Sequence, residues 1–263
     1  MFNLLSNGVT NSKIKKNMKE GYLTYSLNFA HSNLSGYNVC QKAELLIGNN
    51  DSKFSGSKAA CSLSCVGGGG LANVYSSVLE SRIKKTISFF KDRDYFLNSL
   101  VYEIEKAIKQ AKNKGLKPSF RLNAYSDILW ERYKIKDNKN IFELFPDIEF
   151  YDYTKILKRK TPGNYQLTYS HYGKMFETLK ALKAGLNVAM VFNELPPNIK
   201  INNKEYTVIN GDQTDLRLDE KINGKPVIVG LKFKAPAQFK QQQLLEGIKS
   251  GFVVQSNNRA FIC

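Results

Sequence analysis

Residues 21–40 read GYLTYSLNFAHSNLSGYNVC, and this stretch decides how the chain is best interpreted. Tyr22–Phe29 alternates in polarity and is rich in β-prone side chains, a pattern that predicts a strand. The polar turn that follows, residues 30–36, leads to Cys40. In parallel α/β folds ligands bind beyond the C-terminal ends of the strands. We therefore expect Cys40 to lie where a ligand would bind.

The rest of the chain repeats a unit of strand, polar turn and helix. Residues 71–91 and the segment after Asp94 carry apolar side chains at helical spacing, with Asp94 as N-cap and Gly115 after the second helix. Further strands are predicted over 118–123, 148–153, 165–170, 187–192, 206–209 and 227–231, with short helices near 141–145 and 175–185. This alternation is typical of a parallel sheet with crossover helices.

These units predict an α/β fold in a single domain over residues 20–263, preceded by an irregular segment over residues 1–19. A complete or partial (β/α) barrel fits the order of the units best, and an open doubly wound sheet is the alternative. No GxGxxG motif follows the first strand, which disfavours a dinucleotide-binding fold.

Composition limits the partners that the protein can have. No apolar run reaches about 18 residues, and the N-terminus lacks the apolar core of a signal peptide, so we expect a cytoplasmic protein with no membrane partner. The formal net charge is +16 at pH 7. Nucleic acid is the commonest polyanionic partner of a soluble basic protein, although a solvated lysine-rich surface gives the same composition.

Three of the four cysteines stand close together and are followed by glycines. Cys40, Cys61 and Cys65 have the spacing C-x20-C-x3-C, which in a reducing compartment favours metal or redox chemistry over disulfides. Three thiolates suit a [4Fe-4S] cluster with one open iron. A zinc site would need His31 or His171 as a fourth ligand, and ordinary buried thiols are the third possibility. The glycines that would let a ligand approach the backbone are Gly67, Gly68, Gly69 and Gly70.

Polar side chains stand at the predicted ends of the strands, which in a barrel converge on one mouth. The candidate catalytic residues among them are Asp127, Asp212, Asp215 and Lys232, and the candidate cofactor-binding residues are Asn28, Asn123, Ser126 and Ser170. Asp212 and Asp215 could bind a cation, orient a hydroxyl or act as general base, or they could cap a strand in an Asx-turn. Asp127 is a candidate acid or base, or the N-cap of the segment that starts at Ile128.

A run of basic residues follows the strand predicted at residues 148–153. Its members are Lys155, Lys158, Arg159 and Lys160, with Tyr151, Tyr153 and Tyr165 nearby. Basic residues among aromatic ones suit phosphate contacts and base stacking. A solvated charged loop beside core tyrosines is the alternative.

Several separated stretches resemble a phage protein family named for gene product 88. They are GYLTYSLNFA, SGYNVC, RIKKTISFFKD, KGLKPSFRLNAYSDILWE, FPDIEFYDYTK, NYQLTYS, INGDQTDLR and VIVGLKFKA, in this order over most of residues 20–255. The resemblance implies a phage origin, and hence the cytoplasm of an infected cell, but no known reaction.

The layout is also distantly similar to the radical-SAM barrels, although their CxxxCxxC loop is replaced here by the longer spacing. That similarity implies a cluster on Cys40, Cys61 and Cys65, with the four glycines near S-adenosylmethionine.

Three functions follow from the sequence. The first is an iron–sulfur, radical-SAM-like enzyme that modifies a nucleic acid or nucleotide. The second is a transglycosylase-like or glycosidase-like barrel that exchanges or cleaves a nucleobase, with Asp127 or Asp212 as nucleophile or base and zinc on the cysteines. The third is a phage nucleic-acid-binding protein without catalysis, whose metal is structural. No GxSxG, HExxH or Walker A motif is present.

Overall fold

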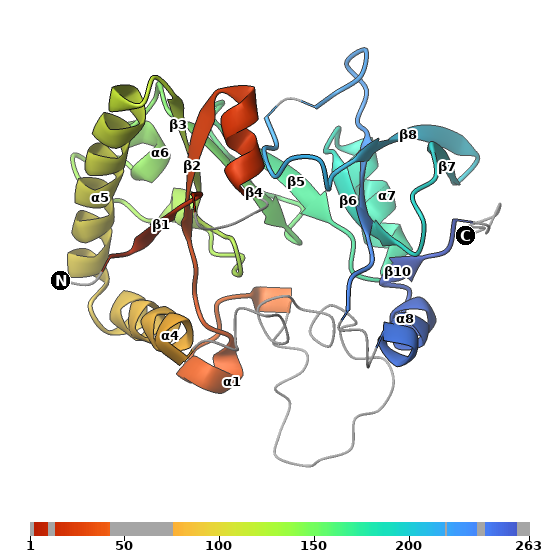
Figure 1. Cartoon of the computed structure of the whole chain (residues 1–263), viewed down its shortest axis with the longest axis horizontal. Helices are drawn as coiled ribbons and strands as arrows, with labels where there is room; N and C mark the ends of the chain where they lie inside the picture. The colour runs from red at the N-terminus through yellow and green to blue at the C-terminus, as the bar shows by residue number, and fades with distance from the viewer. Residues whose placement is uncertain (1–2, 10–13, 43–75, 219, 236–239, 257–263) are drawn as a thin grey trace.

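The computed structural model describes residues 3–9, 14–42, 76–218, 220–235 and 240–256 (Figure 1). Its strands are β1 (Leu5–Asn7), β2 (Tyr22–Leu27), β3 (Lys117–Arg121), β4 (Glu149–Thr154), β5 (Tyr165–Ser170), β6 (Val188–Phe192), β7 (Asn198–Ile201), β8 (Lys204–Asn210), β9 (Ile228–Lys232) and β10 (Val253–Val254). Its helices are α1 (Ser32–Ser35), α4 (Ser76–Lys91), α5 (Arg93–Asn113), α6 (Ile141–Leu144), α7 (Met175–Lys183) and α8 (Lys240–Lys249), with the 3-10 helices η1 (Ile14–Glu20) and η4 (Trp130–Arg132).

The described strands form one sheet in the order β1-β2-β3-β4-β5-β6-β9-β8-β7, with β10 added beside β6. Every pairing from β2 to β9 and β8 is parallel, whereas β1 and β7 are antiparallel to their neighbours. The predicted α/β class with parallel strands is therefore confirmed. The sheet is open and mixed, because an antiparallel strand ends it on either side, and the described strands do not close into a complete barrel.

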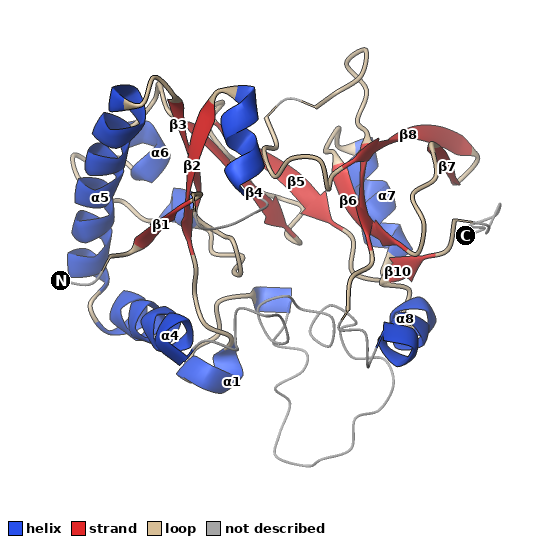
Figure 2. Ribbon diagram, in the orientation of Figure 1, coloured by secondary structure: helices blue, strands red, loops and turns tan. Residues whose placement is uncertain are grey.

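The helices lie beside two separate apolar cores (Figure 2). The first joins α4 and α5 to β2, β3 and β4, and it includes Phe120 and Phe150. The second joins α7 to β6 and β9, and it includes Met190 and Ile228. The two halves of the sheet meet where β5 pairs with β6 over only two residue pairs. The backbone pairing between the halves is therefore short.

One face of the sheet is polar over its first strands. In β2 the side chains of Leu23, Tyr25 and Leu27 enter the core beside α5. Thr24 and Ser26 alternate with them and are also buried, so they lie on the opposite face. Parallel sheets usually bury apolar side chains on both faces. A buried polar face therefore needs a cover that satisfies its hydrogen bonds.

η1 and the turn after β8 provide that cover. Asn17 of η1 donates hydrogen bonds to the Thr24 hydroxyl at 2.8 Å and the Tyr151 hydroxyl at 3.1 Å. Its side-chain oxygen accepts from the Thr214 hydroxyl at 2.7 Å and the Asp215 amide at 3.1 Å. η1 is the red helix at the upper centre of Figure 1. One amide side chain thus joins β2, β4 and the turn after β8.

The sequence predicts an irregular segment over residues 1–19, but the described part of it contains β1 and η1. β1 extends the sheet as an antiparallel edge strand beside β2. The backbone amides of Leu4 and Leu5 donate to the carboxylate of Glu103 on α5 at 2.7 and 2.8 Å. Contacts with distant elements order this segment, and local sequence does not reveal such contacts.

Candidate functional site

The segment that carries Cys40 crosses the C-terminal edge of the sheet. The Tyr37 ring stacks on Phe90 of α4, with ring centroids 4.6 Å apart. Two residues later, the carbonyl of Val39 accepts a hydrogen bond from the amide of Asp127 at 2.8 Å. Because Asp127 follows β3, this bond fixes the segment beyond the C-terminal end of β3.

Cys40 continues along the same edge. It is half-buried, and its amide donates to the side-chain oxygen of Asn38 at 2.8 Å. Lys42 pairs with Glu177 of α7 at 3.4 Å and lies 5.8 Å from the ring of Tyr172, which follows β5. Cys40 therefore lies beyond the ends of β3 to β5. The predicted partners Cys61, Cys65, Gly67, Gly68, Gly69 and Gly70 lie outside the described residues.

The described residues alone do not form a metal site: no three or more of their His, Cys, Asp and Glu side chains gather as ligands. His171, predicted as one possible fourth zinc ligand, is buried with both ring nitrogens bonded. Nδ1 is 2.7 Å from the Thr178 hydroxyl, and Nε2 is 2.9 Å from the Gly251 carbonyl oxygen. Burial lowers the pKa of this imidazole to about 4. These bonds give His171 a structural role, which leaves His31 as the histidine for a zinc site.

Asp127 is a buried acceptor that joins the ends of β3 and β4. Its carboxylate accepts hydrogen bonds from the Thr154 hydroxyl at 2.8 Å and the Lys155 amide at 2.7 Å. Arg159 lies 3.3 Å away. Burial raises the pKa of Asp127, while these three partners act to lower it. The carboxylate is thus enclosed by protein donors, an arrangement that supports a structural role better than the predicted acid or base role.

The basic run after β4 divides into buried and exposed members. The side chain of Arg159 is only 2% exposed and donates two hydrogen bonds, of 2.9 and 2.7 Å, to the carboxylate of Glu131. Lys158 and Lys160 are exposed, and Lys155 is half-buried. Arg159 is therefore engaged inside the protein, which argues against its predicted contact with nucleic acid.

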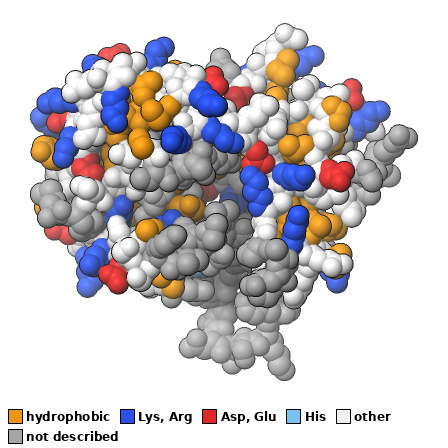
Figure 3. All heavy atoms as spheres, viewed as in Figure 1, with side chains coloured by type: hydrophobic (Ala, Val, Ile, Leu, Met, Phe, Trp, Pro, Cys, Tyr) orange, Lys and Arg blue, Asp and Glu red, His pale blue; other side chains and the backbone are white. Residues whose placement is uncertain are grey.

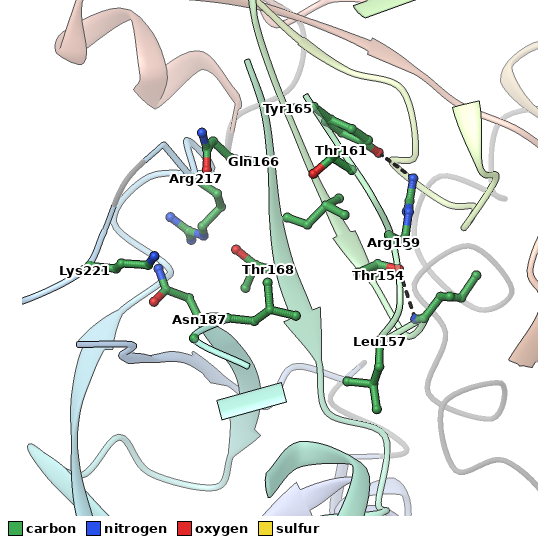
Figure 4. A pocket seen from close by; sticks show the side chains of 14 residues that line it. Thr154, Leu157, Arg159, Thr161, Tyr165, Gln166, Thr168, Asn187, Arg217 and Lys221 are labelled. Atoms are coloured by element: carbon green, nitrogen blue, oxygen red, sulfur yellow. Dashed lines mark hydrogen bonds between the residues drawn. The ribbon is translucent and has the colours of Figure 1, made fainter. Parts of the chain in front are cut away.

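Arg159 also lines a small pocket of about 160 Å³ along β5 (Figure 4). Arg217 and Lys221 line it from the other side of the strand, with Asn187 close to Lys221. Arg217 is already bound to the Tyr153 hydroxyl at 2.8 Å and to Glu220 at 2.9 Å. Arg159 and Arg217 both have protein partners, so neither guanidinium is free to bind a ligand in this pocket.

The predicted cofactor-binding residues mostly bind neighbouring residues of the same turn or strand. The side-chain oxygen of Asn123 accepts from the Ser126 hydroxyl at 2.7 Å and from the Trp130 indole at 3.2 Å. Asn28 donates to the Ser26 hydroxyl at 3.2 Å. Ser170 ends β5 in register with Ala189. Asn123 and Ser126 thus shape the turn after β3, and the structure gives neither of them a ligand-binding geometry.

The two acids predicted to work together have separate surroundings. Asp215 is buried and pairs with Arg121 at 3.0 Å beneath η1. Asp212 lies nearer the surface, where it pairs with Lys234 at 2.9 Å and accepts from the Lys232 amide at 3.0 Å. The backbone carbonyl of Asp212 accepts from Lys16 of η1 at 2.8 Å. Asp212 and Asp215 therefore have different partners and do not act as a pair on one ligand.

Two cations that the sequence does not single out lie buried at the same edge. Arg82 and Lys85 of α4 are 6% and 4% exposed. Lysine and arginine are rarely buried, so sequence reasoning would place both residues on the solvent side of the helix. The guanidinium of Arg82 lies 4.4 Å from the ring centroid of Tyr125, in the turn after β3. The sequence signal is the three-residue spacing within RIKK, which places Arg82 and Lys85 next to each other on one face of the helix.

No helix of the described residues is long and apolar enough to cross a membrane.

Comparisons with known proteins identify one relationship. No curated protein and no solved structure matches the chain. A family model described as Gene product 88 matches residues 3–255, a range that spans the sheet from β1 to β10. The chain therefore belongs to the gene product 88 family.

Proposed function

We propose that this protein is a phage enzyme that acts on a nucleic acid or nucleotide at the C-terminal edge of its sheet. Cys40, Cys61 and Cys65 would hold a metal centre there, in the first instance an iron–sulfur cluster. The observation that supports this proposal is the position of Cys40 beyond the ends of β3 to β5. Ligands of parallel α/β proteins bind at that edge.

The open sheet is consistent with part of a (β/α) barrel, because β2 to β6 follow one another in space as they do in sequence. A cluster with one open iron supplies redox chemistry when it is bound. This chain would contribute the three thiolates and, through Gly67–Gly70, backbone close enough to hold S-adenosylmethionine. The half-buried position of Cys40 suits a ligand that must be shielded from bulk water yet reached by a substrate.

The nucleic-acid part of the proposal is supported by a second group of lysines. Lys16, Lys232 and Lys234 meet around Asp212, although they come from η1 and from the end of β9. We define the η1–β9 basic surface as the exposed residues Lys15, Lys16, Lys19, Lys232 and Lys234. Figure 3 shows Lys and Arg side chains across the upper middle of the face that carries η1. Such a surface suits phosphate backbone contacts.

This basic surface also favours a second candidate function, a phage nucleic-acid-binding protein without catalysis. The transglycosylase-like alternative has less support. It needs Asp127 or Asp212 as nucleophile or base, and both carboxylates are occupied by protein donors.

Cysteine variants of anaerobically purified protein test the proposed centre. Cys40→Ala, Cys61→Ala and Cys65→Ala should each lose most of the bound iron and sulfide. Cys263→Ala removes the remaining cysteine and is the matched control, so it should retain the metal content of the wild-type protein. Equal metal content in all four variants would sink the proposal. Thermal unfolding of each variant separates loss of the metal from loss of the fold.

A further inference from the structure

Arg82 and Lys85 are two buried cations that have no carboxylate partner among the residues that the structure describes. Both residues are more than nine-tenths buried. Nε of Arg82 is buried with no hydrogen-bond partner, and no acid of the described residues forms an ion pair with either side chain. Glu103 is the acid that acts on Lys85 from a distance. Its two carboxylate oxygens already accept the amides of Leu4 and Leu5.

The contacts that the described residues make do not compensate the burial of these two charges. A buried ion without an opposite charge beside it destabilises the folded state. Arg82 has a cation–π contact with Tyr125 and no ion pair among the described residues, and Lys85 has no cation–π contact among the described aromatic rings. Arg82 and Lys85 also repel each other, and burial lowers the pKa of Lys85 to about 8. An anion between them would remove both penalties.

The position of the pair points to the same edge as Cys40. The Thr86 hydroxyl donates to the carbonyl of Arg82 at 2.8 Å and accepts from the amide of Ala30 at 2.9 Å. Ala30 follows β2, and Tyr125 follows β3. The guanidinium of Arg82 is therefore held between the C-terminal ends of the first two parallel strands, on a helix that is anchored there.

We propose that Arg82 and Lys85 form an oxyanion site that binds a phosphate group at the C-terminal edge of the sheet. Arginine offers a planar fork of donors and lysine a compact charge, which together suit a tetrahedral phosphate. The phosphate would belong to a nucleotide, to a nucleic acid or to free inorganic phosphate. The site itself needs no metal, so it rests on the proposed function only for the source of that phosphate.

Calorimetric titration of the full chain with inorganic phosphate, a nucleoside monophosphate and the matching nucleoside tests the site. The two phosphate-bearing probes should bind and the nucleoside should bind at least about tenfold more weakly, the size of one charge-assisted hydrogen bond. Tighter binding of the monophosphate than of phosphate assigns the site to a nucleotide or nucleic acid. Equal binding assigns it to free phosphate. No binding of either phosphate-bearing probe would overturn the proposal.

Substitutions on α4 provide the matched comparison. Arg82→Gln and Lys85→Gln should each weaken phosphate binding about tenfold or more. Lys84→Gln removes an exposed charge between them and should have almost no effect. An equal loss in all three variants would show only general charge attraction and would contradict a built site.

The midpoint of thermal unfolding tests the same site without a measurement of binding affinity. Phosphate should raise the midpoint of the wild-type protein and of Lys84→Gln, but not that of Arg82→Gln or Lys85→Gln. Without phosphate, Lys85→Met should unfold at a higher temperature than the wild-type protein, because it removes an uncompensated buried charge. A lower midpoint for Lys85→Met would contradict the inference. Iron content, measured in the same variants, should not change. This control distinguishes a failure of the phosphate site from a failure of the cysteine metal centre.

Discussion

Asp127, His171 and Asn123 show how single side chains can carry the pattern of a functional residue and yet hold the fold together. Each stands just after a strand, as ligand-binding residues do, but each is buried with protein partners. Asp152 lies within β4 and is fully buried, and the sequence did not single it out. Burial raises the pKa of its carboxyl group to about 7, against the opposing effect of Arg121. Sequence spacing locates such residues, but only burial and partners distinguish the two roles.

His171 allows a direct test of burial. Its folded pKa of about 4 lies below the ordinary value of 6.5, because desolvation penalises the charged imidazole. The free energy of unfolding is therefore highest above pH 6.5 with respect to this group. It falls by about 3 kcal/mol as the pH drops from 6.5 towards 4. A proton NMR titration of both histidines, with His31→Gln for assignment, should find that His171 stays neutral to about pH 4. A midpoint for His171 near 6.5 would contradict this packing.

At the scale of elements, local patterns predicted those strands whose own sequence alternates or is apolar. β4, β5 and β6 begin within one residue of the predicted starts. β1, β10 and α8 escaped prediction because they are short or polar and depend on distant partners. The β7–β8 hairpin carried a usable signal in Asn202-Asn203, both of which adopt positive φ at the turn. The N-cap of α5 is Asp92, not Asp94 as predicted.

The junction between β3 and β4 is predicted to depend on Asp127. Asp127→Ala would remove three interactions and leave Arg159 buried with one fewer anion, so we expect a loss of about 3–5 kcal/mol in the free energy of unfolding. Asp212→Ala, which removes a more exposed ion pair, should cost less than about 1 kcal/mol. Urea denaturation of the two variants provides the comparison. Equal losses would mean that Asp127 is not the structural link described here.

At the scale of the whole molecule, the fold class and the family could be predicted from the residues alone, but the extent of closure could not. Closure depends on which strands occupy the edges. Here the edges are β1 and β7, which each pair antiparallel with the next strand along the chain, and neither of these two strands was predicted. The candidate site shows the same division. The position of Cys40 followed from the end of the first strand. The buried pair Arg82 and Lys85 could not be predicted, because it depends on how α4 packs.

The protein has a net charge of +16, and we predict that the η1–β9 basic surface is the part of it that binds DNA. Replacing the five lysines of the η1–β9 basic surface with glutamine should weaken DNA binding and reduce its dependence on salt, by a slope of up to about 0.9 for each phosphate that the protein no longer neutralises. A control variant removes five exposed lysines near and along α5, namely Lys91, Lys106, Lys109, Lys112 and Lys114. Electrophoretic mobility shifts at several salt concentrations should show a smaller effect for the control. Equal effects would mean that charge alone, and not this surface, governs binding.

We propose a metal centre on Cys40, Cys61 and Cys65 at the C-terminal edge of the sheet. Iron, zinc and acid-labile sulfide, measured together with the visible spectrum of wild-type protein purified without oxygen, test it most directly. The claim predicts a brown protein with about four iron and four sulfide per chain. Zinc without sulfide would contradict the cluster and favour a structural metal. A colourless protein without bound metal would contradict the metal centre itself and leave nucleic-acid binding as the supported function.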